Sequence, residues 1–252
     1  MARKLKKKVK KRIGITVLVL LIVILIVVAS FTAQYYFTYN EELKPVVKEK
    51  EYYTIEDFGV ERAKSEKDFN ENGQDDYIDI LDGAKKYATF NQKYEINYYA
   101  NGYPPIEKEG VAADLIWYAL KNAGYNLKDL ISKDVQKTLG TGTYYIDNVD
   151  ANIDFRRIRN QETFFIRYAK VLDTDYEEIG QFLPGDIITF DNCDHIAIVS
   201  DKYTKEGIPY IISHREKQQE KEENLLKNTE MKVTGHYRFE YNKKLQELIY
   251  SK

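Results

Sequence analysis

The three histidines and the single cysteine all lie in the second half of the chain, and His195, His214 and Cys193 are the candidates among them for proton transfer or nucleophilic attack. A positioned histidine acts as a general base near neutral pH, provided that its second ring nitrogen is held. The nucleophile that it serves must lie within about 3 Å. Cys193 precedes His195 by only two residues, and positions so close on one strand aim poorly at each other. We therefore interpret Cys193 as a bystander thiol, with a catalytic role as the less favoured alternative.

A better place for a nucleophile is the start of a buried helix, where free N–H groups and the positive dipole end favour a thiolate. The stretch 109–120 has this character, because Gly110 ends a loop and apolar residues recur at helical spacing from Val111. The residue at the expected nucleophile position is Ala112. Alanine has neither a lone pair nor an acidic proton, so covalent catalysis cannot begin there.

Other polar residues near these positions have two interpretations each. Asp114 lies one turn into the predicted helix and would either complement the helix dipole or anchor a hydrogen bond. Arg156 and Arg157 would most simply form salt bridges or lie at the surface, and carboxylate binding by one of them is the alternative. His236 falls in a predicted core strand and is interpreted as structural.

The elements that would position these residues change in type along the chain. Helical patterns cover residues 77–90, 111–123, 126–139 and 161–172. Strand patterns cover residues 187–190, 195–201, 210–214 and 235–240. Helices followed by an antiparallel sheet indicate an α+β fold. Alternation along the second strand places His195 on one face with Ala197 and Val199, and His214 shares a face with Ile212.

The N-terminal region predicts a membrane segment. Residues 1–12 carry eight Lys or Arg and no acid, and residues 13–37 are uncharged and mostly apolar. About 20 such residues cross a bilayer, and the basic side stays cytoplasmic, so we expect a single-pass signal-anchor with an extracellular C-terminal part. A cleaved signal peptide is the alternative, although the apolar run exceeds the usual length of about 7–15 residues. Residues 38–66 are charge-rich and predict a stalk, which leaves residues 67–252 for one domain.

Charge and cysteine content argue against a nucleic-acid-binding protein and against a fold held by internal disulfides. The formal net charge is −2, and setting aside the eight positive charges of residues 1–12 leaves −10 on the remainder. An acidic exterior argues against a nucleic acid partner, because phosphate binding needs clustered Lys and Arg. A single cysteine cannot form an internal disulfide, so an extracellular fold would depend on its core or on bound metal.

Residues 68–79 match the spacing of a calcium-binding loop. Glycine at position 6, Gly73, permits the sharp turn that wraps oxygen ligands around one hard cation. The expected ligands are Asp68, Asn70, Asn72, the carbonyl of Gln74 and Asp79. Position 12 is Asp79 instead of the usual bidentate Glu. The alternative is a polar turn that caps the helix that follows.

Five motifs together carry a resemblance to a known family. They are Gly110-Val111-x-x-Asp114, Asn152-Ile-Asp154-x-Arg156-Arg157, Leu183-Pro-Gly-Asp186, Asp194-His195-Ile-x-Ile-Val-Ser-Asp201 and Gly235-His-Tyr-Arg-Phe. In this order they resemble the bacterial domain-of-unknown-function family 1287, over about residues 75–240. That family is similar to the NlpC-type, papain-like cell-wall amidases and peptidases.

The resemblance implies a papain-like fold with its site at the helix start. In such a fold a Cys follows the Gly-Val pair, a His on the next β segment is its base, and a further polar residue orients that base. This chain matches at His195 and departs at Ala112. The resemblance suggests His214 as the orienting residue. The chain is then either a natural pseudoenzyme or a Cys-to-Ala variant of an active protein.

Two functions follow as hypotheses. The first is a membrane-anchored, non-catalytic protein whose papain-like cleft binds a peptidoglycan peptide or a cell-envelope protein. The second is a hydrolase of amide or peptide bonds in the cell envelope, which would act without a thiolate at Ala112 and at a much lower rate.

Overall fold

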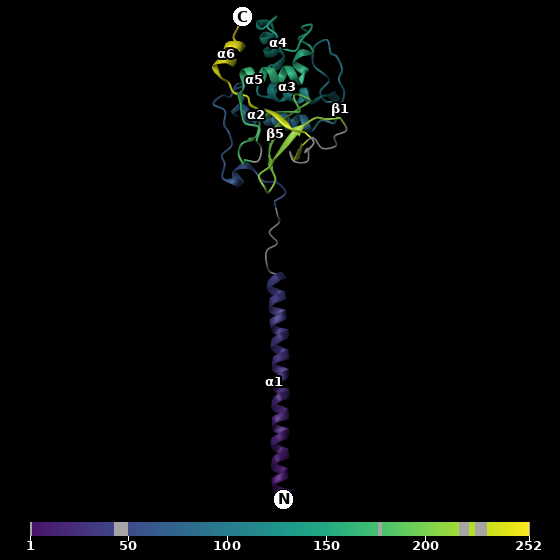
Figure 1. The fold of residues 1–252 in the computed structure, drawn as a ribbon, viewed down its shortest axis with the longest axis vertical. Coiled ribbons are helices and arrows are strands. Elements are labelled where there is room, and N and C mark those ends of the chain that lie inside the picture. The colour runs from purple at the N-terminus through teal and green to yellow at the C-terminus, as the bar shows by residue number, and fades with distance from the viewer. Residues whose placement is uncertain (1, 43–49, 176–177, 217–221, 225–230, 252) are drawn as a thin grey trace. The chain divides into compact units, whose positions relative to one another are not determined.

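The computed structural model describes residues 2–42, 50–175, 178–216, 222–224 and 231–251. The chain forms two separate compact units, residues 1–50 and residues 51–252. Figure 1 traces both along the chain.

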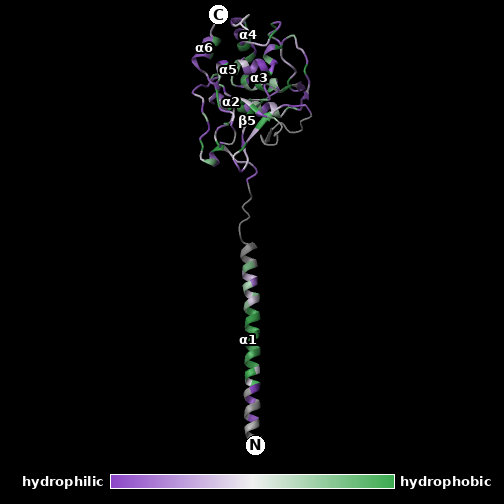
Figure 2. Cartoon of the chain, in the orientation of Figure 1, coloured by the Kyte–Doolittle hydropathy of each residue, from purple (hydrophilic) through white to green (hydrophobic). Residues whose placement is uncertain are grey.

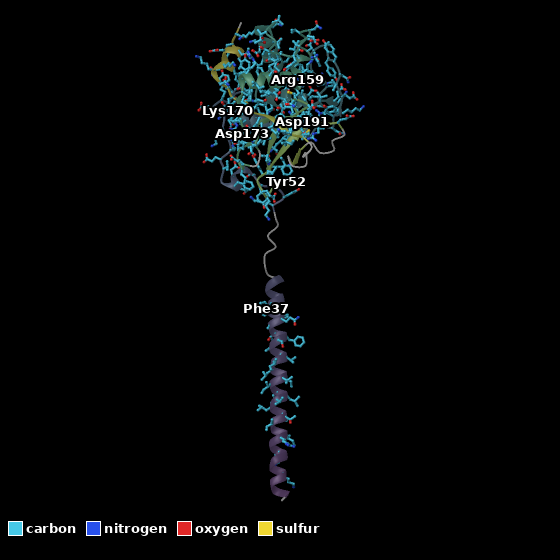
Figure 3. All side chains as sticks on the ribbon, in the orientation of Figure 1. Phe37, Tyr52, Arg159, Lys170, Asp173 and Asp191 are labelled. Atoms are coloured by element: carbon cyan, nitrogen blue, oxygen red, sulfur yellow. The ribbon has the colours of Figure 1, made fainter. Side chains whose placement is uncertain are left out.

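Most of what the structure describes of the first unit is one long helix, α1 (Ala2–Glu42). Its segment Arg12–Phe37 spans 26 residues and contains an 18-residue window with a mean hydropathy of 3.3, which is long and apolar enough to cross a membrane. Figure 2 shows this segment as the hydrophobic part of α1, and Figure 3 shows side chains such as Phe37 projecting from it. The predicted apolar span of residues 13–37 is therefore confirmed as a helix. Its orientation stays a prediction.

The second unit contains a six-stranded sheet in the order β3-β8-β4-β5-β6-β7, in which all neighbours are antiparallel. Its strands are β3 (Lys170–Val171), β4 (Ile187–Phe190), β5 (His195–Tyr203), β6 (Pro209–Ser213), β7 (Glu222–Asn224) and β8 (Val233–Arg238). Two very short strands, β1 (Lys93–Tyr94) and β2 (Glu109–Gly110), pair in parallel outside this sheet.

Within the described part of this unit, five α-helices accompany the sheet: α2 (Asp76–Ala88), α3 (Ala112–Asn122), α4 (Leu127–Lys137), α5 (Ile158–Tyr168) and α6 (Lys243–Ile249). The same residues include the short 3₁₀ helices η1 (Ile55–Phe58) and η2 (Asp154–Arg156). Helices α2 and α3 pack against each other, and α3 packs against β5. The predicted α+β class with an antiparallel sheet is thus confirmed.

The sheet has two apolar faces that contact different parts of the chain. Ile187, Ile196 and Ile198 join the core made with α2, α3 and α5. Ile188 and Ala197 belong to a separate cluster on the opposite face. Alternation along paired strands therefore fixes which side chains can reach the helices.

Part of the expected stalk belongs to the second unit. Tyr53 pairs with Tyr203 of β5 through two backbone hydrogen bonds of 3.0 and 2.8 Å. Ile55 is buried in a cluster with Tyr203 and Leu183. Residues 51–66 thus differ from the predicted stalk, because a few apolar side chains in a charge-rich stretch are enough to dock it on the sheet.

Candidate functional site

Helix α3 begins where the sequence predicts. Val111 is its N-cap with an extended backbone, and Ala112 is the first helical residue. Because Val111 has no side-chain oxygen, Asp114 supplies the cap from within the first turn, accepting the Val111 N–H at 2.9 Å. Of the two interpretations of Asp114, the structure therefore realises the hydrogen-bond anchor.

Asp114 and Arg156 form a buried bidentate ion pair. Arg156 Nε and Nη2 lie 2.7 and 2.8 Å from the two carboxylate oxygens, and the indole N–H of Trp117 donates to Asp114 at 2.7 Å. Burial by itself would lower the pKa of Arg156, but the hydrogen bonds and charge of Asp114 outweigh it and raise that pKa. Arg156 is thus a structural ion-pair partner of the helix cap.

Arg156 also connects α3 to the segment that precedes it. Its Nη1 donates to the carbonyl of Asn97 at 2.7 Å, and its guanidinium lies over the ring of Tyr99 at 5.2 Å. Tyr99 in turn donates to Glu109 of β2. The guanidinium of Arg156 therefore holds both the first turn of α3 and the loop before it.

His214, which directly follows β6, is tied to the start of α3 through Tyr87 of α2. The Tyr87 hydroxyl lies 2.8 Å from Nδ1 of His214 and 3.3 Å from the carbonyl oxygen of Val111. Both contacts are satisfied when His214 Nδ1–H donates to Tyr87 and Tyr87 donates to Val111. In this tautomer Nε2 of His214 carries the lone pair. Sequence reasoning missed Tyr87, because its helical pattern marks it only as a core aromatic.

The same tyrosine requires glycine at position 110. A Cβ built on Gly110 would lie 2.6 Å from the Tyr87 hydroxyl, closer than Cβ atoms approach other heavy atoms. Burial raises the pKa of Tyr87 well above its ordinary value, so the hydroxyl stays protonated. Gly110 therefore keeps open the space in which Tyr87 meets His214.

His195 lies on the face of the sheet opposite to α3. It pairs with Phe190, whose ring it contacts at 5.9 Å, and Ala197 and Val199 lie on that same face. The predicted alternation is confirmed, and it places His195 on the side of the sheet away from the helix start with which the resemblance pairs it. Burial, followed by the charge of Arg215 and that of His214 when it is protonated, lowers the pKa of His195 to about 3. A group of such low basicity is a poor match for a general base at neutral pH.

The residues around the first turn are covered. Ala112 is 1% exposed and His214 is 2% exposed. The ring of Tyr94, from β1, packs edge-on against His214 at 5.3 Å. A ligand would reach this site only if the cover that includes Tyr94 moved. The roles expected for Ala112, His195, His214 and Asp114 in a cleft stay predictions.

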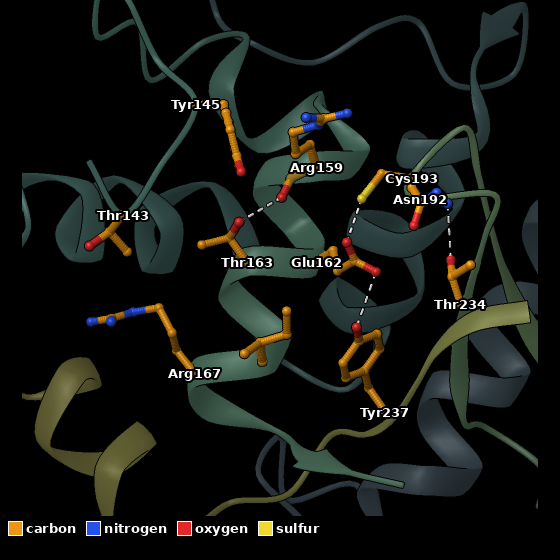
Figure 4. A pocket seen from close by; sticks show the side chains of 11 residues that line it. Thr143, Tyr145, Arg159, Glu162, Thr163, Arg167, Asn192, Cys193, Thr234 and Tyr237 are labelled. Atoms are coloured by element: carbon orange, nitrogen blue, oxygen red, sulfur yellow. Dashed lines mark hydrogen bonds between the residues drawn. The ribbon is translucent and has the colours of Figure 1, made fainter. Parts of the chain in front are cut away.

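Cys193 is held as a neutral thiol away from α3. It donates to the carboxylate of Glu162 in α5, as the dashed line in Figure 4 marks. Burial, followed by the hydrogen bond and charge of Glu162, raises the pKa of Cys193 to about 12. The thiolate needed for nucleophilic attack is therefore disfavoured, in line with its interpretation as a bystander.

His236 has a structural environment. Its Nε2 lies 2.9 Å from Asp186 and its Nδ1 lies 2.6 Å from the carbonyl of Asp173. Asp186 also accepts two hydrogen bonds from Arg238, at 2.7 Å each. The ring stacks on Phe182 at 4.1 Å. This buried network fastens the Leu-Pro-Gly-Asp turn to β8.

The loop 68–79 is closed by its own hydrogen bonds. Asp68 accepts the N–H groups of Asn72 and Gly73 at 3.1 and 2.8 Å, and Asp79 accepts the side-chain amides of Asn70 and Asn72 at 2.8 and 2.9 Å. Those amides therefore present nitrogen to Asp79, and each would have to rotate to offer oxygen to a cation. Among the described residues, no group of three His, Cys, Asp or Glu is placed to hold a metal.

A carboxylate outside the expected set of calcium ligands caps helix α2. Asp75 is the N-cap of α2 and accepts the Tyr77 N–H at 3.1 Å. Asp75 was not among the expected calcium ligands, so a capping role and a cation role for this loop involve different carboxylates. The calcium ligands Asp68, Asn70, Asn72, Gln74 and Asp79 stay a prediction.

Comparison with known proteins relates these elements to one family. The family described as Domain of unknown function (DUF1287) matches residues 81–239, which run from α2 to the end of β8. The uncharacterized protein YijF of Escherichia coli (strain K12) is 32% identical over 169 residues, covering 64% of this chain and 80% of YijF. No solved structure matches. The matched span thus includes the helix start, the Tyr87–His214 contact and the six-stranded sheet. The chain belongs to the DUF1287 family.

Proposed function

We propose that this chain is a membrane-anchored, papain-like domain of the cell envelope that binds a peptidoglycan peptide or a cell-envelope protein without cleaving it. The binding site is the first turn of α3. The apolar part of α1 spans the membrane, and the basic residues before it keep that end in the cytoplasm. Residues 51–252 then lie outside the cell.

One observation carries the proposal: Tyr87 orients the imidazole of His214 beside the residue that immediately precedes Ala112. A helix start with an oriented imidazole is the arrangement of a nucleophile and its base. The base in this proposal is His214, because it lies on the face of the sheet that meets α3. The methyl group of Ala112 then removes the covalent step and leaves the geometry for binding.

The alternative is an active amide or peptide hydrolase of the cell envelope. A thiol mechanism through Cys193 lacks support, because this thiol is bound to Glu162 and its pKa is raised to about 12. A mechanism that uses only histidine and backbone N–H groups would be slower than a full triad by orders of magnitude.

The test uses the full chain in detergent micelles and a peptidoglycan peptide as the probe. We expect the unchanged protein to bind the peptide in a calorimetric titration and to leave it intact by mass spectrometry. Ala112→Cys should gain cleavage, whereas Ala112→Ser, the matched control, should not. Combining Ala112→Cys with His214→Gln should abolish the gained activity.

Two results would overturn the proposal. Cleavage by the unchanged chain that depends on His195 would make the hydrolase correct and His195 its base. Absence of binding by both the unchanged chain and Ala112→Cys, with melting temperatures preserved, would remove the peptide as the ligand of this site.

A further inference from the structure

A cavity of about 550 Å³ lies beside α5, separate from the covered first turn of α3. Its lining residues come from α5, from the β4–β5 turn, from β8 and from residues 143–145. Two of its apolar side chains are largely exposed, Tyr145 at 67% and Ile166 at 56%. Its size and mixed lining suit a small organic ligand with charged groups.

Glu162 is a carboxylate of this cavity that can accept one more hydrogen bond. Thr189 and Tyr237 donate to its Oε1 at 2.5 and 3.1 Å, and Cys193 donates to its Oε2. A carboxylate accepts about four hydrogen bonds, two on each oxygen. The three donors recorded in the described residues are neutral, so they position the negative charge without balancing it. The remaining lone pair of Oε2 suits a cationic N–H donor.

Arg159 supplies a cation at the same cavity. It lies three residues before Glu162 on α5, a spacing at which opposite charges usually pair. Its guanidinium instead stacks over the ring of Tyr145 at 4.9 Å. The other arginine of the cavity, Arg167, is already bound to Asp134, with its Nε and Nη2 at 2.6 and 3.0 Å from the two carboxylate oxygens. Arg159 is therefore the guanidinium suited to an incoming carboxylate.

The β4–β5 turn that closes the cavity has a costly backbone. Asp191, Asn192 and Cys193 have φ angles of 47°, 57° and 79°, in the left-handed region that non-glycine residues seldom adopt. Strain of this kind persists where surrounding contacts fix it, and it concentrates at ligand sites. Here the turn places Asn192 and Cys193 on the cavity wall.

We propose that this cavity binds a small zwitterion, such as a free amino acid or dipeptide, with its ammonium group on Glu162 and its carboxylate on Arg159. A hard metal cation fits less well, because Glu162 is the single carboxylate among the described lining residues and its neighbours direct their hydrogens toward it. The exposed faces of Tyr145 and Ile166 would contact the carbon atoms of the ligand. This second site does not depend on the function proposed for α3.

The experiment titrates the full chain in detergent micelles with alanyl-alanine, N-acetyl-alanyl-alanine and alanyl-alanine amide, followed by ligand-detected NMR. Acetylation removes the ammonium group, and amidation removes the carboxylate. Glu162→Gln should weaken binding of alanyl-alanine by about tenfold and leave the acetylated form unaffected. Arg159→Gln should weaken it by about threefold, because Arg159 is exposed, and leave the amide unaffected.

Arg157→Gln is the matched control, because Arg157 is exposed near the start of α5 but does not line the cavity. It should bind all three probes as the unchanged protein does. If Glu162→Gln fails to fold by circular dichroism, the Arg159 variant and the three probes decide the outcome. Equal affinities for all three probes, or an absence of saturable binding to the folded unchanged chain, would overturn the assignment.

Discussion

The hydroxyl oxygen of Tyr87 lies 2.8 Å from Nδ1 of His214, which joins α2 to the residue after β6. This contact crosses from a helix to the sheet and fixes the imidazole on the face where α3 packs. The same hydroxyl reaches the Val111 carbonyl, so one side chain sets the geometry of both the base and the helix start. The space around Tyr87 is therefore the most sensitive part of the candidate site.

Gly110→Ala should destabilise the protein by about 1–3 kcal/mol, because the added methyl group would lie 2.6 Å from the Tyr87 hydroxyl. Tyr87→Phe removes that oxygen, and the next atoms, on Asp114, lie 3.5 Å or more from the methyl group. The double variant should therefore cost less than the sum of the two single variants. Urea unfolding of all four proteins measures this coupling.

A control for that cycle is Tyr241→Phe, at a tyrosine that packs against Phe69. Its effect should add to that of Gly110→Ala within about 0.5 kcal/mol. Strict additivity of Gly110→Ala with Tyr87→Phe as well would contradict the close approach.

Arg156→Met should cost about 3–5 kcal/mol of unfolding free energy, because it leaves the buried carboxylate of Asp114 without its cation. Replacing both partners, in Asp114→Asn with Arg156→Met, should cost less than Arg156→Met alone. Chemical denaturation measures both. Arg157→Met, at an exposed neighbour, should change stability by less than about 0.5 kcal/mol. A small effect of Arg156→Met would mean that the ion pair contributes little to folding.

His195 should make the protein less stable in acid. Its pKa is lowered from 6.5 to about 3 in the folded chain, so between these values the unfolded state binds more protons. Stability from this residue is complete above about pH 6.5 and falls as the pH approaches 3, by at most about 1.4 kcal/mol per pH unit. His195→Phe removes the titrating group and should flatten this part of the stability profile.

The difference in stability between the unchanged chain and His195→Phe isolates the contribution of His195 from that of the carboxylates. Burial raises the pKa of Asp76 and Asp154, which gives a contribution of opposite sign, but both are present in each protein and cancel in the difference. Parallel profiles for the unchanged chain and His195→Phe between pH 3 and 6.5 would show that His195 keeps an ordinary pKa.

Calcium should raise the melting temperature if residues 68–79 bind it, because a ligand of the folded state alone stabilises by about 2.7 kcal/mol at a hundredfold excess over Kd. Asp68→Ala should abolish the rise. Asp75→Asn, at the N-cap of α2, should retain it, because Asp75 is not among the expected ligands. A melting temperature unchanged at several millimolar calcium would leave this loop with its structural hydrogen bonds alone.

The sequence by itself determined the elements with strong local patterns. The apolar run of residues 13–37 predicted the central part of α1, and helical spacing predicted α2, α3 and α4 to within about two residues of their ends. These patterns succeed because the periodicity of buried side chains is a local property of helices and strands. The start of α3 at Ala112 and the shared face of His195, Ala197 and Val199 were predictable for the same reason.

Only the tertiary structure decided which face of the sheet receives α3. Alternation assigns the residues of β5 to two faces but does not show which face contacts the helices. In the structure Ile196 and Ile198 contact the helices, and His195 lies on the other face. The contacts of His214 with Tyr87 and of Glu162 with Cys193 join residues 127 and 31 positions apart. Such contacts depend on how distant elements pack, and no local spacing encodes them.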